Sequence, residues 1–155
     1  MKANWHPAPK HLQSVLSGIW TLESDSASLA AKVLPDGTPY VVFQRDGTRL
    51  ASTDNDRQQW STACVSGPRS SSFDIELCPS GQIFIVQLSS SGGLPILGLP
   101  MSELKDRCEK VEDVVGIAIE VRELSEQIMS SSDSNCLQLI ENWIEKRLSV
   151  SNRNR

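Results

Sequence analysis

Two hydrophobic periodicities divide the chain near Pro100. Before this residue, short apolar runs alternate with turn residues, a pattern typical of the strands of an antiparallel barrel or sandwich. After it, glycine and proline become rare and apolar residues recur every three or four positions, as in amphipathic helices. The pattern therefore predicts an α+β fold, in which an antiparallel β unit is followed by a C-terminal helical hairpin.

Five segments of the N-terminal part have the length and apolar content of strands. They are residues 15–22, 40–45, 59–65, 73–77 and 82–88. Turn residues separate them, among them Pro35-Asp36-Gly37, Gly67-Pro68 and Gly92-Gly93. Proline, aspartate and glycine favour turns on conformational grounds, so we interpret these motifs as fold architecture.

Two long helices are predicted after Pro100, with a shorter helix over residues 102–107. The apolar stripe of the first long helix consists of Val114, Ile117, Ala118, Val121, Leu124 and Ile128, and that of the second of Cys136, Leu137, Ile140, Trp143, Ile144 and Leu148. Residues 130–133 break the helical pattern and offer caps for the second helix. Asp113 is expected near the start of the first, where its charge complements the helix dipole.

Length and charge fit one acidic domain. The chain has 155 residues, of which 39% are hydrophobic and 22% charged, with a net charge of −4. We assign residues 1–148 to a single domain, with the β unit at about 12–100 and the helices at about 102–148, and residues 149–155 to a basic linker. The negative charge argues against a protein whose main role is to bind the phosphate backbone of a nucleic acid.

No segment approaches the length of a membrane-spanning helix, and no apolar run near the N-terminus marks a signal peptide. A cytoplasmic protein is the expectation. The four cysteines, Cys64, Cys78, Cys108 and Cys136, form no CxxC unit. We therefore expect reduced thiols that pack as small hydrophobic residues.

Catalytic motifs are not found in the sequence. Its two histidines, His6 and His11, both precede the first predicted strand and flank prolines, so they form neither an HxH nor an HExxH unit. No serine lies in a GxSxG elbow, and Gly92-Gly93 lacks the context of a phosphate-binding loop. We predict that the chain is not an enzyme and needs no metal or cofactor.

A series of short motifs carries more information than any of these features. They are Trp5-His6-Pro7-Ala8-Pro9, Ile19-Trp20-Thr21-Leu22-Glu23, Lys32-Val33-Leu34-Pro35-Asp36-Gly37, Tyr40-Val41-Val42-Phe43, Val65-Ser66-Gly67-Pro68-Arg69, the segment 94–100, Ser102-Glu103-Leu104-Lys105-Asp106 and Val111-Glu112-Asp113-Val114-Val115-Gly116. In order and spacing they resemble the N-terminal regulatory domain of a subgroup of AraC-type transcription regulators. The resemblance covers about residues 5–148.

The resemblance implies a cupin-like β-barrel that senses a small effector, dimerises, and is followed by a DNA-binding domain with two helix-turn-helix units. Only seven residues follow Leu148, so we expect that DNA would be bound through a domain absent from this chain. The glycine- and proline-rich stretch usual before the "LG.P" motif is Ser89-Ser90-Ser91-Gly92-Gly93-Leu94-Pro95 in this sequence, so a pocket built from that loop would differ. A stand-alone cupin-like module that binds a small molecule is the alternative. A cupin-like enzyme would require a metal.

Candidate site residues follow from the predicted elements. Four aromatic side chains and one cation could line an effector pocket: Trp20, Phe43, Trp60, Phe84 and Arg69. Four residues of the second long helix could form a homodimer contact: Leu137, Ile140, Trp143 and Ile144. Both sets have a structural alternative, which the residue types favour: the aromatics and the helical stripe could form the domain core instead.

Overall fold

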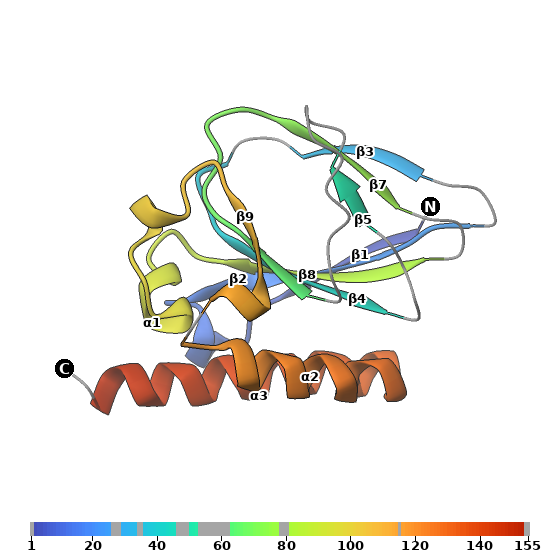
Figure 1. Cartoon of the computed structure of the whole chain (residues 1–155). Helices are drawn as coiled ribbons and strands as arrows, with labels where there is room; N and C mark the ends of the chain where they lie inside the picture. Colours follow the sequence, from blue (N-terminus) through green and yellow to red (C-terminus); the bar gives the residue numbers. More distant parts are fainter. Residues whose placement is uncertain are drawn as a thin grey trace.

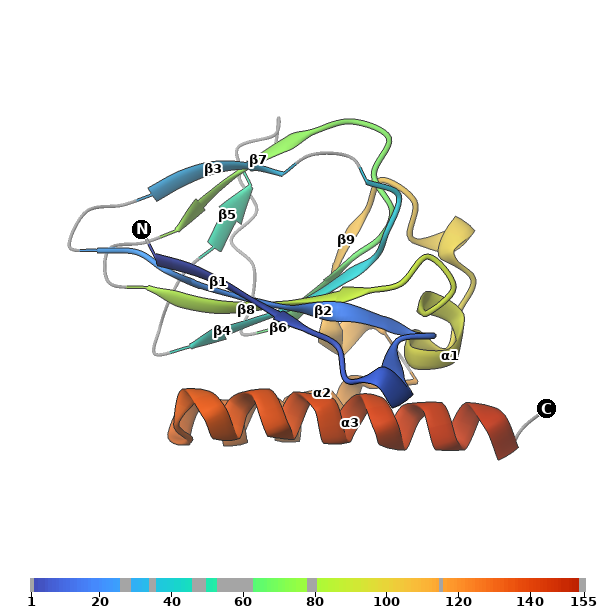
Figure 2. The same ribbon diagram turned by 180° about the vertical axis from the view of Figure 1, so that it is seen from behind.

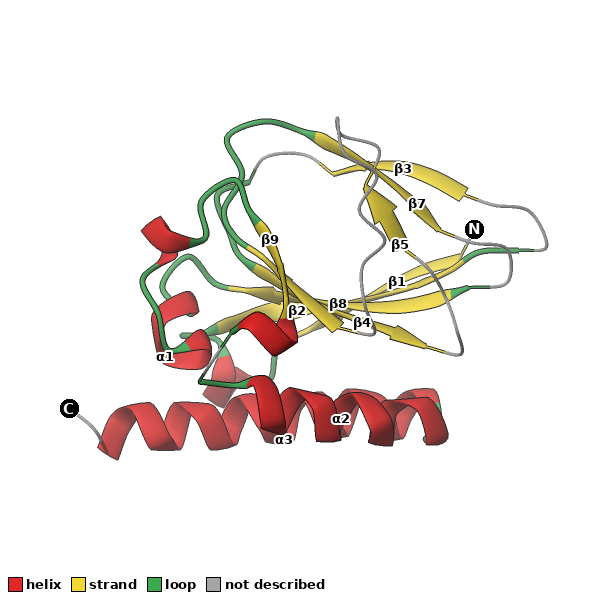
Figure 3. Cartoon of the chain, viewed as in Figure 1, coloured by secondary structure: helices red, strands yellow, loops and turns green. Residues whose placement is uncertain are grey.

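The computed structural model describes residues 2–25, 29–33, 36–45, 50–52, 63–77, 81–114 and 116–153. They form three layers, with a helical hairpin on one side, a six-stranded sheet in the middle and a three-stranded sheet on the other side (Figure 1). Helices and strands are segregated, and the long C-terminal helix runs along most of the β unit (Figures 2 and 3). The α+β class and the succession of β unit and hairpin are confirmed.

Strands dominate the first part of the chain, and the two long helices come last. In sequence order the elements are β1 (Lys2–Pro7), η1 (Lys10–Leu12), β2 (Leu16–Glu23), β3 (Leu29–Val33), β4 (Tyr40–Arg45), β5 (Leu50–Ser52), β6 (Ala63–Ser66), β7 (Phe73–Leu77), β8 (Gln82–Leu88), α1 (Gly93–Leu97), η2 (Met101–Glu103), β9 (Cys108–Lys110), η3 (Val111–Asp113), α2 (Ala118–Ser130) and α3 (Asp133–Arg153). The letter η denotes a short 3-10 helix. Residues 59–62 of one predicted strand lie outside the described part of the chain.

Both sheets are antiparallel, but neither closes into a barrel among the strands that the structure describes. The larger sheet has the order β1-β2-β8-β4-β6-β9 and the smaller one the order β3-β7-β5. Strands β1 and β9 are the edges of the larger sheet, paired only with β2 and β6. The sandwich form of the sequence prediction therefore describes this arrangement better than a closed barrel.

The two faces of the six-stranded sheet have different partners. Ile19, Val41, Phe43 and Phe84 belong to the cluster of buried residues that includes the apolar stripes of α2 and α3. The residues that alternate with them belong to the opposite face, because successive side chains of a strand point to opposite sides. The three-stranded sheet lies on that side of the larger sheet (Figure 1). Val42, Cys64, Ile83 and Gln44 lie on that second face and are at most 4% exposed. The central strands are therefore buried on both sides.

The helical region differs from the prediction before Ala118. Asp113 ends the short helix η3 and lies five residues before α2, so it does not complement the dipole of that helix. Residues 102–107 form only η2 and a turn, because Asp106 adopts a left-handed φ of 57° that ends helical geometry. The short helix α1 was not predicted; it ends at Gly98, whose φ of 79° suits glycine.

The end of α2 and the start of α3 agree with the prediction. The Ser132 hydroxyl accepts a hydrogen bond from the Asn135 backbone N–H at 3.4 Å, as an N-cap does. Helix α3 then continues to Arg153, so residues 149–153, expected to be a linker, are helical. In the described part of the chain no helix combines the length and the apolar character that crossing a membrane requires.

The stripe of α3 proposed for dimerisation packs within the chain instead. Ile140 and Ile144 are fully buried, Trp143 is 6% exposed, and only Leu137 is partly accessible. The Trp143 ring meets Phe43 edge to face, with centroids 6.5 Å apart. These contacts hold the hairpin on the sheet, so a dimer would have to use other residues.

The role of α3 in the core can be tested with Ile140→Ala. Because Ile140 is fully buried, its truncation should lower the free energy of unfolding by about 2–5 kcal/mol. Chemical denaturation followed by Trp fluorescence measures the change. Lys146→Ala, on the exposed side of the same helix, should stay within about 0.5 kcal/mol of wild type. Equal stability of the two variants would contradict the packing of α3 in the core.

Candidate functional site

Residues of the segment 101–107 line two cavities. The first, which we call the cationic cavity, has a volume of about 330 Å³ and is lined by Gly37, Pro68, Arg69, Ser70, Met101, Ser102 and Lys105. The second, the junction cavity, has a volume of about 780 Å³ and is lined by Leu97, Gly98, Leu99, Ser102, Glu103, Leu104, Arg107, Glu109, Asp113, Val114 and Gly116. Ser102 lines both cavities.

The walls of these cavities consist largely of the short motifs noted in the sequence. The cationic cavity joins the Pro35-Asp36-Gly37 turn, the Gly67-Pro68-Arg69 motif and the Ser102–Asp106 motif. The junction cavity joins the last of these to the segment 94–100 and to the segment 111–116. Motifs interpreted as separate turns thus meet in space. The occurrence of these motifs together in one sequence indicated that they matter, but their spacing along the chain could not predict that they line the same cavities.

The backbone at Gly67 approaches the segment 101–107 very closely. Strand β6 pairs with β9, and the pairing continues past the strands: the Gly67 N–H donates to the Arg107 carbonyl at 3.0 Å, and the Asp106 N–H to the Pro68 carbonyl at 2.9 Å. A Cβ atom at position 67 would lie 1.9 Å from the Leu104 carbonyl oxygen. Only glycine fits, and this contact places Arg69 and Lys105 at one cavity.

Asp106 fixes the loop after Gly67. Its carboxylate accepts hydrogen bonds from the Ser70 backbone N–H at 2.7 Å and from the Ser70 hydroxyl at 2.8 Å. These bonds, together with the charges of Lys105 and Arg69, lower the pKa of Asp106. The carboxylate is therefore an anion that lies near both cations and is held by Ser70.

The turn that carries Gly37 is organised by Asp36. The carboxylate accepts hydrogen bonds from the Thr38 backbone N–H at 3.1 Å, from the Thr38 hydroxyl at 2.9 Å and from the Tyr40 hydroxyl. Burial and the neighbouring Asp36 raise the pKa of Tyr40 to about 12. Tyr40 therefore stays neutral and keeps donating its proton to Asp36, which holds the turn against β4. Pro35 lies outside the described residues.

The junction cavity is more acidic than the cationic cavity. Glu103, Glu109 and Asp113 contribute carboxylates, whereas Arg107 is its single cation among the described lining residues. Arg107 is already engaged, with Nη2 at 2.5 Å from Glu109 Oε1 and Nη1 donating to the Glu103 carbonyl at 3.3 Å. Leucine and valine side chains complete the wall. This lining suits a molecule with an apolar body and no negative charge.

Helices α1, α2 and α3 meet beside the junction cavity. Arg147 of α3 is 12% exposed and donates from Nε to the Ile96 carbonyl of α1 at 2.9 Å. Its Nη1 lies 3.9 Å from Glu120 Oε2 of α2, and the same oxygen accepts the Trp143 Nε1–H at 3.2 Å. Because Leu97 and Gly116 line the cavity, its walls continue directly into α1 and into the segment that starts α2.

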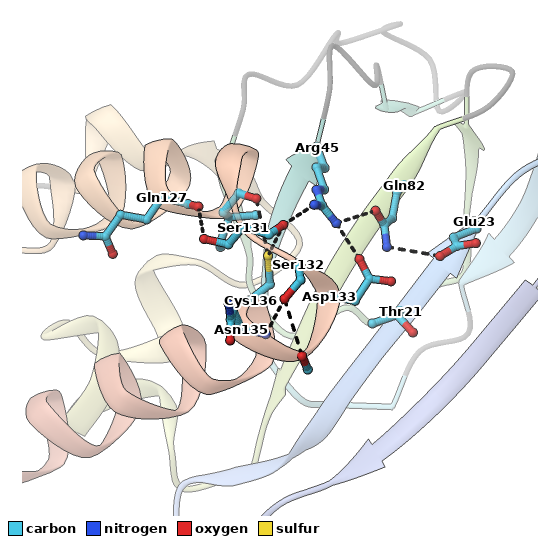
Figure 4. Close-up of polar contacts among 12 residues, drawn as sticks. Thr21, Glu23, Arg45, Gln82, Gln127, Ser131, Ser132, Asp133, Asn135 and Cys136 are labelled. Carbon is cyan, nitrogen blue, oxygen red and sulfur yellow. Dashed lines mark hydrogen bonds and ion pairs between the residues drawn. The ribbon is translucent and has the colours of Figure 1, made fainter.

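A second polar cluster ties the far end of the hairpin to the sheet (Figure 4). Arg45, at the end of β4, donates from Nη1 to Gln82 Oε1 at 3.0 Å and to Asp133 Oδ1 at 2.5 Å. Its Nη2 donates to the Ser131 carbonyl in the α2–α3 connection. Gln82 in turn donates to Glu23 at 3.2 Å. The hairpin is thus held by arginines at both ends.

The five residues proposed to line one pocket are dispersed. Phe43 and Phe84 are cross-strand partners that are fully buried in the core beneath the hairpin, so for them the structural alternative holds. Trp20 lies on the opposite face of the sheet and its ring centroid is 5.0 Å from that of Trp5. Trp60 lies outside the described residues. Of the four that the structure describes, Arg69 alone lines one of these two cavities.

The histidines and the described cysteines are also separated. His6 lies 3.3 Å from the Thr21 hydroxyl and His11 lies 3.6 Å from Glu145. Cys64, Cys108 and Cys136 are reduced thiols, and Cys78 lies outside the described residues. In the part of the chain that the structure describes, no three metal-binding side chains gather into one site.

The close approach at position 67 predicts a strong effect of Gly67→Ala. The added methyl group would overlap the Leu104 carbonyl, so the backbone must move and we expect a loss of about 1–3 kcal/mol in the free energy of unfolding. Gly116→Ala is the matched control, because its Cβ would meet its nearest neighbour at 3.9 Å. Thermal unfolding of both variants measures the difference. A Gly67→Ala protein as stable as Gly116→Ala would refute the contact.

Tyr40 is the chain's single tyrosine, which makes its ionisation directly observable. Its ultraviolet absorbance should titrate with a pKa near 12 in the folded protein, against the ordinary value of 10.0. Because the folded-state pKa is raised, the stability that neutral Tyr40 contributes is fully present below pH 10 and is lost as the pH rises toward 12. Asp36→Asn should bring the titration closer to 10 but leave it above, since burial is the larger cause. A Tyr40 pKa at the ordinary value of 10.0 in the folded wild-type protein would contradict the burial of its hydroxyl group beside Asp36.

The family comparison agrees with the limits of the β unit. No curated protein matches the chain. A family model described as "Domain of unknown function (DUF6597)" matches residues 4–110. The match begins within β1 and ends at the last residue of β9, so it spans the six-stranded sheet and most of the lining of both cavities, and it leaves α2 and α3 outside. The chain therefore belongs to the DUF6597 family.

Proposed function

We propose that this chain is the regulatory domain of an AraC-type transcription regulator, which binds a small effector and controls a helix-turn-helix DNA-binding domain. The motif resemblance supports the proposal, because it extends over almost the whole chain in the order of that family. The coarse architecture supports it too, because an antiparallel β unit is followed by a helical hairpin, as the resemblance implies.

The observation that carries the proposal is the position of the junction cavity. Leu97 of α1 and Gly116 before α2 line it, and Arg147 connects α1 to α3. An effector in this cavity would contact segments bonded to both long helices, so binding would favour one position of the hairpin over another. A DNA-binding domain that follows α3 would then take a different position when the effector is bound.

Dimerisation and a cytoplasmic location complete the proposal. A regulator of this kind would act as a homodimer in the compartment that holds the DNA. Because three of the four expected contact residues of α3 are buried, the dimer would form through the exposed side of the hairpin or through a sheet edge. A stand-alone small-molecule module would use the same cavity without transmitting a signal.

The test uses the natural gene product. Deletion of the gene should change transcript levels at specific promoters, and the wild-type gene should restore them. Arg147→Met should impair restoration because it breaks the α1–α3 contact, whereas Arg153→Met, an exposed arginine of the same helix, should restore fully. Folding of both variants is checked by circular dichroism.

Two results would count against the regulator. One is an unchanged transcriptome after deletion. The other is a natural gene product in which this domain is joined to no helix-turn-helix unit. Either would favour the stand-alone binding module.

A further inference from the structure

We propose that an exposed stripe of α2 is a homodimer seam, against which α2 of a second copy of the chain packs in the antiparallel direction. Four residues define this seam: Ile119, Arg122, Glu126 and Met129. The inference rests on the proposed function in one respect, because the regulator is proposed to act as a homodimer. It names the surface and the geometry of that dimer.

The seam carries apolar side chains that the fold itself does not bury. In the described part of the chain four large apolar side chains are exposed, and two of them belong to α2: Ile119 is 69% exposed and Met129 is 41% exposed. The core face of the same helix is already occupied, since Val121 and Ile128 are buried. Packing of α2 on the sheet therefore leaves Ile119 and Met129 unused, and a second apolar contact would cover them.

The four seam residues lie along one side of α2. Their spacing of three, four and three positions is that of a heptad stripe, so they fall within about 80° of one another around the helix. The side that faces α3 is marked by Glu120, which contacts Trp143 and Arg147. The middle of the seam lies about 140° around the helix from Glu120, on the flank away from α3. In Figure 1 α2 lies in front of α3, and in Figure 2, seen from behind, α3 lies in front.

The seam is complementary to itself. When two antiparallel α2 helices are related by a two-fold axis beside position 124, Ile119 lies opposite Met129 of the partner subunit. The same axis places Arg122 opposite Glu126 of the partner subunit, because both pairs of positions are centred on 124. Each contact then occurs twice. Two apolar pairs flank two ion pairs.

Charge favours this direction of packing. Arg122 is the single cation of α2, and within the described part of the chain neither Arg122 nor Glu126 has an ion-pair partner. A parallel pair of helices would place each residue opposite its own copy, so that arginine would meet arginine and glutamate would meet glutamate. The antiparallel pair instead gives every seam charge an opposite charge.

The apolar part of the seam is tested by measuring the mass of the full chain by sedimentation velocity over a range of concentrations. The mass should rise from that of one chain to that of two. Ile119→Ser should weaken the dimer at least about tenfold, because two copies lose their apolar contact. Leu94→Ser is the matched control, since Leu94 is 57% exposed but lies on α1, and it should leave the dimer unaltered.

The register is tested by charge reversal. Arg122→Glu or Glu126→Arg alone should weaken the dimer about tenfold, because two attractive pairs become repulsive. Both reversals together should restore it. Arg153→Glu, the same charge change at an exposed position of α3, should have no such effect. All substituted side chains are exposed, and thermal unfolding checks that each variant folds.

A chain that stays monomeric up to its solubility limit would overturn the seam, as would equal dimerisation of Ile119→Ser and Leu94→Ser. A double reversal that dimerises as weakly as the single reversals would overturn the antiparallel register. Sedimentation requires no DNA, so its outcome is separate from that of the transcript test. A dimer through this seam without any effect of gene deletion would reject the proposed regulator alone, and transcriptional control by a monomeric chain would reject the seam alone.

Discussion

The backbone contact between Gly67-Pro68 and the segment Leu104–Arg107 is the constraint on which the candidate site depends. It extends the β6–β9 pairing by two further hydrogen bonds, so a segment that would otherwise be a surface loop becomes a continuation of the sheet. That segment supplies lining residues to both cavities. The contact therefore determines where Arg69 lies relative to Lys105.

The second organising feature is the attachment of the hairpin to the sheet. The buried apolar stripes of both helices, among them Val121 and Ile128 of α2 and Ile140 and Ile144 of α3, belong to one core cluster with residues of the sheet. Arg45 and Arg147 add directional hydrogen bonds near the two ends of the hairpin, and both guanidinium groups are largely shielded from solvent. Charge-assisted hydrogen bonds that are shielded from solvent fix the orientation of the hairpin more than they add to the stability of the fold. This suits an element whose position would carry a signal. This arrangement connects the junction cavity to α2 and α3.

Much of the architecture could be predicted from the sequence. Strands β2, β4, β7 and β8 and both long helices follow from apolar periodicity, which reports burial directly. The edge strand β1 has no fully buried residue and β9 is only three residues long, so neither produces a periodic signal. Helix α1 contains Pro95 in its first turn, where proline is tolerated, and has too few residues for a helical period.

The candidate site was less accessible to sequence reasoning. Four consecutive residues of β4, from Val41 to Gln44, are buried, so no alternation of apolar and polar residues indicates which aromatic faces which layer. This is why Phe43 could be assigned to a pocket although it lies in the core. The cavities depend on contacts between residues more than thirty positions apart. The motifs indicated which segments matter, but only the close approach at Gly67 brings them together.

Amide hydrogen exchange at Gly67 and Asp106 tests the central contact most directly. If the segment 101–107 is a fixed part of the fold, both amides exchange only as slowly as those in the β4–β8 core, because the same global unfolding must expose them. Exchange at the rate of an unprotected loop would mean that the two segments part in the native state. The two cavities would then not be permanently formed in the native state.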